Sequence, residues 1–66
     1  MILFEYLKGV NYEQDLELYV LDWEKSIPYG SKQFVPYNLL LFDVVMNEVC
    51  YTVNGNLLIP IEKKEL

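Results

Sequence analysis

A single cysteine and no histidine leave this 66-residue chain without the cross-links that commonly stabilise very small domains. Cys50 has no second cysteine with which to form an intramolecular disulfide, and a structural zinc site lacks its usual ligand set. A chain this short buries only about 60% of the surface that its unfolded form exposes, so its core is thin. We therefore expect one small domain over residues 1–66, stabilised by an apolar composition or by association with another chain.

The composition is suited to both uses. Apolar residues make up 53% of the chain, which includes six tyrosines, three phenylalanines and one tryptophan. Large aromatic side chains bury much area in a core, and they are also enriched at protein interfaces. Because these aromatics exceed what so small a core can hide, we expect some of them to serve an interface.

Three residue types are absent and restrict the function. The chain has no histidine, no arginine and no alanine, and five lysines against ten acids give a net charge of −5. It therefore lacks the commonest acid–base residue, and it is too short to enclose a substrate, so we do not expect an enzyme or a bound cofactor. Nucleic acid would be repelled, since binding it depends on cations that neutralise phosphates.

The first residues show no basic region and no cleavage signal, and no apolar stretch approaches the roughly 20 residues of a membrane helix. We therefore expect a cytoplasmic protein with no membrane partner. Frequent lysine, asparagine, tyrosine and isoleucine, with no arginine or alanine, suggest an AT-rich genome such as that of a phage or other mobile element.

Turn signals divide the chain into short segments with strand-like content. Asn54-Gly55 is the strongest, because this pair favours a type I′ turn, and it predicts a tight hairpin between residues 49–53 and 56–59. Pro60 lacks a backbone N–H, so the last strand is expected to be an edge strand or to end there. Residues 2–7 are expected to form the first strand.

Residues 15–24 alternate in the manner of a strand with two different faces. One face would carry Leu16, Leu18 and Val20, and the other would carry Glu17, Tyr19, Leu21 and Trp23.

The stretch from Asn38 to Glu48 fits two structures. As a helix it would begin at Pro36, a favoured first-turn residue, whereas as a strand it would place Leu40, Phe42, Val44 and Met46 on one face. The paired Val44-Val45 favours the strand. We therefore predict a mostly β fold, a small curled antiparallel sheet or partly open barrel of four or five short strands. The alternative is an α+β fold with one helix around 37–48.

All the net negative charge lies in the first 24 residues, which hold six acids and one lysine. If the strand extends back to Glu13, then Glu13, Asp15 and Glu17 point the same way, about 6.6–6.8 Å apart. They would continue into Tyr19 and Trp23, a pattern that a basic groove with an apolar pocket would complement. The alternative is a solvated strand edge. Carboxylates this far apart do not form a metal site, and no glycine follows as in a calcium loop.

Two further features have a structural and a functional interpretation. The segment 27–37 holds Tyr29 and Tyr37, each directly after a proline, so it is either a stiffened binding loop or a loop packed over the core. Cys50 lies in the predicted hairpin strand with no neighbour that would activate it, so we interpret it as a buried, inert hydrophobe.

Two functional hypotheses follow. The first is a small protein-binding module, an inhibitor among its forms, that engages a basic surface of a nucleic-acid-handling protein. Its binding residues would be Glu13, Asp15, Glu17, Tyr19, Trp23, Tyr29 and Tyr37. The second is a structural or accessory subunit that forms a homodimer or larger homo-oligomer through apolar strand surfaces.

Overall fold

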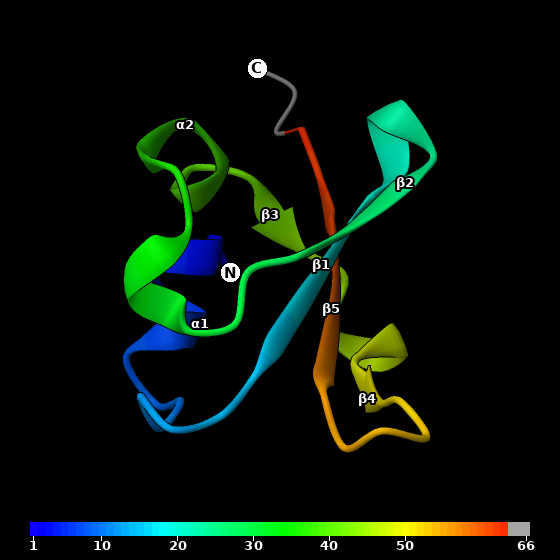
Figure 1. Cartoon of the computed structure of the whole chain (residues 1–66). Coiled ribbons are helices and arrows are strands. Elements are labelled where there is room, and N and C mark those ends of the chain that lie inside the picture. Colours follow the sequence, from blue (N-terminus) through cyan, green and yellow to red (C-terminus); the bar gives the residue numbers. More distant parts are fainter. Residues whose placement is uncertain (64–66) are drawn as a thin grey trace.

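The computed structural model describes residues 1–63, which form a curled sheet with two short helices on one of its faces (Figure 1). In chain order the elements are α1 (Leu3–Leu7), β1 (Leu16–Val20), the 3₁₀ turn η1 (Leu21–Trp23), β2 (Lys25–Pro28), the 3₁₀ turn η2 (Lys32–Phe34), α2 (Tyr37–Leu40), β3 (Asp43–Val44), the 3₁₀ turn η3 (Met46–Glu48), β4 (Cys50–Tyr51) and β5 (Leu57–Glu62).

The sheet has the strand order β2-β1-β5-β3, and β4 also pairs with β5. The predicted small, mostly β fold is therefore confirmed, and over the described residues the sheet does not close into a barrel. The prediction of a wholly antiparallel sheet is wrong at its centre, because β1 and β5 run parallel. Their pairing joins two segments far apart in sequence, and no local turn signal reports it.

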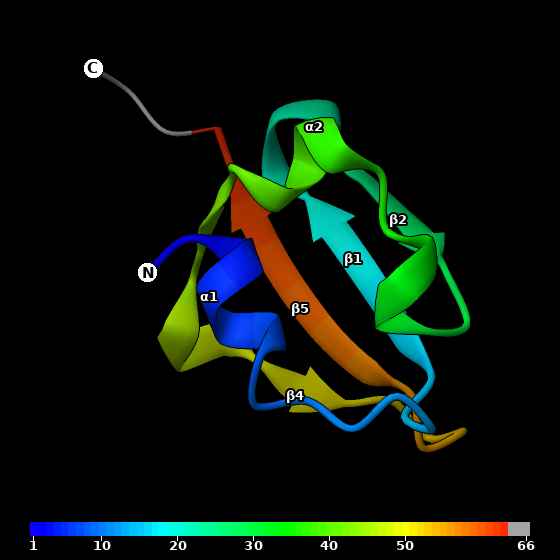
Figure 2. The ribbon, with the colours of Figure 1, turned by 90° about the vertical axis from the view of Figure 1, so that its left-hand side faces the viewer.

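The core lies between the sheet and the helices, as Figure 2 shows with α1 and α2 in front of β1 and β5. The predicted alternation in β1 is confirmed, since its alternate residues Leu16, Leu18 and Val20 are fully buried. Parallel pairing aligns them with Leu57, Ile59 and Ile61 of β5, respectively. Leu3 and Leu7 of α1 and Leu39 of α2 close the core from the other side.

No aromatic side chain belongs to this buried set, which consists of leucine, isoleucine and valine alone. Six of the ten aromatics are instead exposed, namely Phe4, Tyr12, Trp23, Phe34, Tyr37 and Tyr51. The aromatic residues that so small a core could not hide therefore lie at the surface.

The predicted first strand over residues 2–7 is wrong, because Leu3–Leu7 is a helix. The buried residues Leu3 and Leu7 stand four apart, the spacing that aligns side chains along one helix face. The preceding backbone is nevertheless extended and joins the sheet. The N–H of Val44 donates to the Met1 carbonyl at 2.8 Å, and the N–H of Leu3 donates to the Phe42 carbonyl at 2.8 Å.

Neither structure expected for residues 38–48 forms as a single element. A helix does start after Pro36, but it ends at Leu40, and the strand that follows is limited to Asp43 and Val44. Each piece buries one anchor, Leu39 in α2 and Val44 in β3. This apolar stretch therefore forms three short elements, α2, β3 and η3, in place of one long element.

The hairpin around Asn54-Gly55 is confirmed, since β4 and β5 pair antiparallel on either side of it. The turn type differs from the prediction. Gly55 has φ of 85°, whereas among residues 1–63 the only non-glycine with positive φ is Glu24, so the turn is not type I′. The Gly55 N–H donates to the Thr52 carbonyl at 2.9 Å and closes a three-residue loop in which glycine occupies the left-handed position.

Pro60 lies within the central strand, so its assignment to an edge or a strand end is wrong. The Leu57 N–H faces β1, where it donates to the Asp15 carbonyl at 2.8 Å. Since successive N–H groups point to opposite edges of a strand, the nitrogen of Pro60 faces away from β1. On that side β3 and β4 pair with the two ends of β5, and between them the Pro60 carbonyl accepts a bond from the Val45 N–H at 2.9 Å, so the strand loses no donor that this side needs.

Candidate functional site

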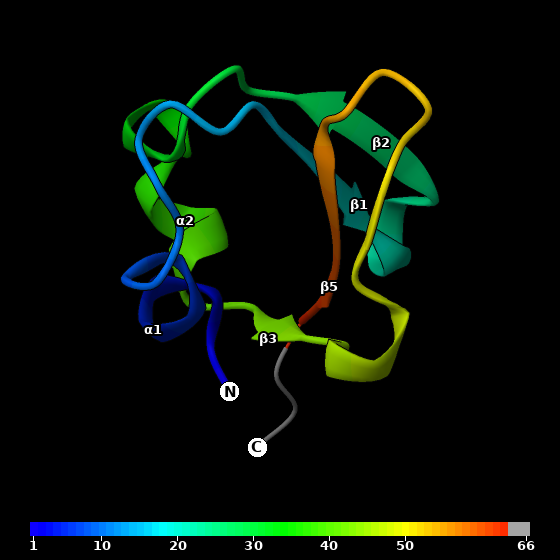
Figure 3. The same ribbon diagram turned by 90° about the horizontal axis from the view of Figure 1, so that it is seen from below.

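The second face of the sheet carries no helix. Glu17 and Tyr19 of β1, with Leu58 and Pro60 of β5, alternate with the buried core residues and therefore point to this face, which we call the open face. Cys50 of β4 joins them, because it pairs with Leu58 across the antiparallel ladder. In Figure 3 the turns η1 and η3 lie on the same side of β5, away from α1 and α2.

A hollow of about 490 Å³ lies on the open face between these two turns. Its apolar floor is formed by Tyr19, Leu21, Leu58 and Pro60, and its rim carries the carboxylates of Glu24 and Glu48. No lysine lines it. Within residues 1–63 neither rim carboxylate forms an ion pair, so the hollow combines apolar surface with uncompensated negative charge.

Glu24 holds an unusual backbone conformation at this rim. It follows η1 in the left-handed region, with φ of 49° and ψ of 44°, and its N–H donates to the Leu21 carbonyl at 3.2 Å. This conformation costs a residue with a side chain about 1–2 kcal/mol relative to glycine. The reversal lets the chain turn directly from β1 into β2, and it leaves the Glu24 side chain exposed beside the hollow.

The predicted row of Glu13, Asp15 and Glu17 does not form, because β1 begins only at Leu16. Glu13 lies in a turn, where its N–H donates to the Asn11 side-chain oxygen at 2.8 Å. Asp15 is exposed just before the strand. The Glu17 carboxylate accepts bonds from the Ser26 hydroxyl at 3.2 Å and the Asn56 amide at 2.9 Å, so it joins β1 to its neighbours.

Of the four aromatics predicted for binding, the structure places Tyr19 alone in the hollow. Trp23 lies in η1 rather than on the strand, and its ring packs edge-on against Phe42 with centroids 6.2 Å apart. Tyr29 packs against the core, and this burial raises the pKa of its hydroxyl above the ordinary value. Tyr37 is 78% exposed at the start of α2, one of the two helices on the other face of the sheet, and it does not line the hollow.

The sequence-based choice of residues missed Leu58, Pro60, Glu24 and Glu48. The sequence does contain a signal for Leu58 and Pro60. Residues Leu57–Ile61 form a continuous apolar run, a pattern typical of strands covered on both faces. Cys50 was expected to be buried and is exposed. Its position beside Leu58 makes it the one native thiol on the open face, and it can therefore carry a probe.

A second group of contacts lies on the helical side, where Lys32 of η2 connects to the segment after α1. Its ammonium donates to the Leu7 carbonyl at 2.8 Å and stands 4.4 Å from the centre of the Tyr12 ring. Ser31 adds a bond from its hydroxyl to the Tyr12 carbonyl at 3.1 Å. These contacts fasten η2 to residues 7–12, which have no regular structure of their own beyond α1.

We expect Lys32→Met to lower the free energy of unfolding by about 1 kcal/mol, since it removes a hydrogen bond from a charged donor and a cation–π contact while keeping the apolar stem. The loss is limited because the Leu7 carbonyl also accepts a bond from the Val10 N–H at 3.0 Å. Urea unfolding followed by circular dichroism measures the change. Lys8→Met is the control, since it removes an exposed ion pair with Glu5 at 3.4 Å and an exposed contact 5.0 Å from the centre of the Phe4 ring, both of which contribute little. Equal effects of the two substitutions would contradict the expectation.

Comparisons with protein families, with curated proteins and with solved structures found no match for this chain. Over residues 1–63 no helix has the length and apolar character needed to cross a bilayer. The same part of the chain brings together no three acidic or cysteine side chains that could hold a metal ion. The open face therefore has to be interpreted from its own chemistry.

Proposed function

We propose that the protein is a small acidic binding module that acts in the cytoplasm and engages the basic surface of a protein partner through its open face. The observation that supports this most directly is the apolar hollow over Tyr19, Leu58 and Pro60, rimmed by the carboxylates of Glu24 and Glu48. The central strand is apolar on both faces, and the helices cover only one of them; on the other face Pro60 is buried, whereas Tyr19 and Leu58 are only half-buried. A partner that occupies the other face would remove this apolar surface from water.

The partner's chemistry follows from the hollow. An apolar or aromatic side chain of the partner would enter it beside Tyr19, and flanking lysines or arginines would meet Glu24 and Glu48. A net charge of −5 would speed the encounter with a cationic surface and reject anionic competitors. Proteins that handle nucleic acids carry such basic surfaces. An inhibitor of one of them, of the kind that phages and mobile elements encode, is the form of binding module that this chemistry fits best.

The test compares two charge reversals of equal size in capture from the lysate of the native host at low and high salt. Glu24→Lys/Glu48→Lys alters the rim. Glu13→Lys/Asp15→Lys makes the same change of net charge in the segment before β1. We expect the rim variant to bind the captured partner at least about tenfold more weakly, because like charges face each other at the contact. The second variant should keep most of the affinity.

Cross-linking locates the contact independently of these variants. A photoreactive maleimide on Cys50 should join the partner, whereas the same probe on Gln33→Cys in a Cys50→Ser background lies on the helical side and should not. Loss of binding in the Glu13/Asp15 variant alone, or cross-linking from position 33 alone, would show that another surface is used. A protein that captures nothing but itself under all salt conditions would contradict the proposal.

The second hypothesis, a homo-oligomer through strand surfaces, would need a free sheet edge. The strand order ends at β3, which has two residues, and at β2, which has four and carries Lys25 and Pro28, two residue types that discourage edge pairing. Oligomerisation through β2 is therefore less well supported than binding through the open face. Light scattering that shows a dimer resistant to high salt would favour it.

A further inference from the structure

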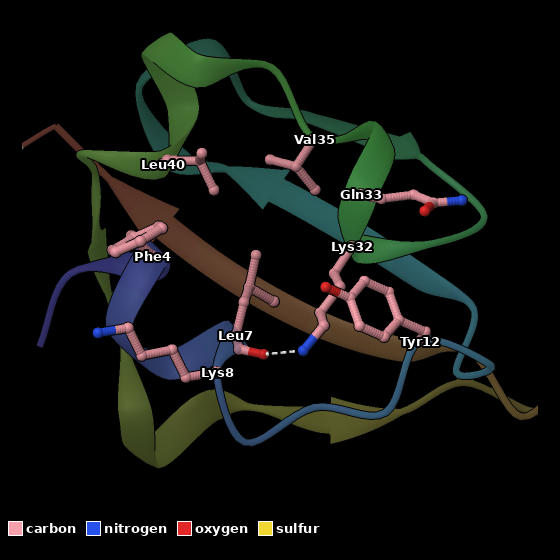
Figure 4. Close-up of a pocket in the computed structure, with 8 residues that line it drawn as sticks. All are labelled: Phe4, Leu7, Lys8, Tyr12, Lys32, Gln33, Val35 and Leu40. Atoms are coloured by element: carbon pink, nitrogen blue, oxygen red, sulfur yellow. Dashed lines mark hydrogen bonds between the residues drawn. The ribbon is translucent and has the colours of Figure 1, made fainter.

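A second pocket lies on the opposite side of the molecule, between α1 and η2 (Figure 4). It has a volume of about 280 Å³, close to the lower limit of about 300 Å³ for ordinary ligand sites. Its lining comes from four separate segments and consists of Phe4, Leu7, Lys8, Tyr12, Lys32, Gln33, Val35 and Leu40.

The charge of this lining is opposite to that of the protein. The chain has five lysines in all, and two of them, Lys8 and Lys32, line this pocket with no acid among the other lining residues. The remaining walls are apolar or aromatic apart from Gln33. Although the protein has a net charge of −5, this pocket therefore combines two cations with apolar walls, which suits a small anion with an apolar part.

Lys32 is the better placed of the two cations. Its ammonium is held in the partly buried wall by the 2.8 Å bond to the Leu7 carbonyl and by the Tyr12 ring, as Figure 4 shows. An ammonium has three N–H donors, so one bond to Leu7 leaves others for a ligand. Its position is fixed before any ligand arrives, which reduces the entropy lost on binding. Lys8 is more exposed and is shared with Glu5, so it adds attraction at the mouth.

We propose that this pocket binds a small organic carboxylate that carries one aromatic ring or a short aliphatic chain. The carboxylate accepts hydrogen bonds from Lys32, and the apolar part packs against Phe4, Leu7, Val35 and Leu40. A phosphate group fits less well, because no arginine is present to bind it bidentately and most of the lining is apolar or aromatic. The site is separate from the open face and does not depend on the function proposed there.

The first experiment uses the unmodified protein and two matched probes. Titration with 3-phenylpropionate, followed by two-dimensional NMR of ¹⁵N-labelled protein, should give saturable shifts at Leu7, Lys32 and Val35. The neutral isostere 3-phenylpropionamide should bind about tenfold more weakly, since it lacks the charge-assisted hydrogen bond. Equal affinity of the two probes, shifts confined to other parts of the molecule, or no saturable shift at millimolar probe would overturn the proposal.

Lysine variants then show which ammonium group binds the carboxylate. Lys32→Met should weaken 3-phenylpropionate binding about tenfold and leave the amide unaffected, and a dispersed spectrum confirms that the variant is folded. Lys25→Met is the matched control, because Lys25 is exposed on β2 and does not line the pocket. If the Lys32 variant unfolds, Lys8→Met tests the pocket instead, and it should weaken binding of 3-phenylpropionate by a smaller factor. Equal loss in the Lys25 and Lys32 variants would show that only overall charge matters.

Discussion

Leu18→Ala should lower the free energy of unfolding by about 2–5 kcal/mol, the range measured when buried leucines are truncated. Leu18 is fully buried in β1, where it pairs with Ile59 on the parallel side and Ile27 on the antiparallel side. A domain of this length has about 3–10 kcal/mol of stability in total. The substitution therefore removes a large part of that stability, and thermal and urea unfolding should show it directly.

Leu41→Ala is the matched control, because Leu41 is 53% exposed after α2 and the same atoms are removed. It should change the free energy of unfolding by less than about 0.5 kcal/mol. Trp23 provides a fluorescence signal that is independent of circular dichroism, since its ring packs against Phe42 between separate elements. If both substitutions had the same small effect, the aliphatic core described above would not be the main source of stability.

The parts of the fold that could be predicted are those with a strong local pattern. The alternation of Leu16, Leu18 and Val20 identified β1 and its buried face, and Asn54-Gly55 identified the hairpin. Residues 2–7 were misassigned because a run of six mostly apolar residues fits both periods. The helix is favoured because it buries both Leu3 and Leu7 in the core, and this packing cannot be read from the local pattern.

The parallel pairing of β1 with β5 could not be predicted from local patterns. It is specified by the match of Leu16, Leu18 and Val20 to the alternate residues of a strand near the end of the chain. That match places Pro60 in a central strand, which a rule based on its missing N–H excluded. The rule failed because Pro60 lies between the β3 and β4 pairings, where the chain uses its carbonyl, bonded to the Val45 N–H, and needs no donor from it.

In the candidate site, too, residues with a local sequence pattern could be predicted, and residues brought together only by the fold could not. Tyr19 was predicted from the alternation and lies in the hollow, but the Glu13–Glu17 row required the strand to extend further back than it does. Glu24 and Glu48 belong to different turns, and only the folded sheet brings them to one rim. Neither residue stands in a sequence pattern that distinguishes it from other surface acids.

Gly55→Val should lower the free energy of unfolding by about 2 kcal/mol, because a β-branched residue strongly disfavours a left-handed backbone. Gly55 has φ of 85° in the β4–β5 loop, and a Cβ there would meet no atom within 4 Å. The cost is therefore conformational and involves no steric clash with the rest of the molecule. The residue also closes the turn through its bond to Thr52, so part of the penalty should appear as fraying of β4.

Gly9→Ala makes the matched comparison, with the opposite expected sign. Gly9 does not have a left-handed φ, and a Cβ there would stand 3.8 Å from the Tyr6 carbonyl oxygen, an ordinary contact. Replacing it should raise the free energy of unfolding by about 0.5 kcal/mol, since alanine restricts the unfolded chain more than glycine does. Urea unfolding of both variants measures the difference, and amide exchange in residues 50–58 locates it. A Gly55→Val protein as stable as the parent would mean that the loop adopts another turn in solution, and the register of β4 against β5 would then have to change with it.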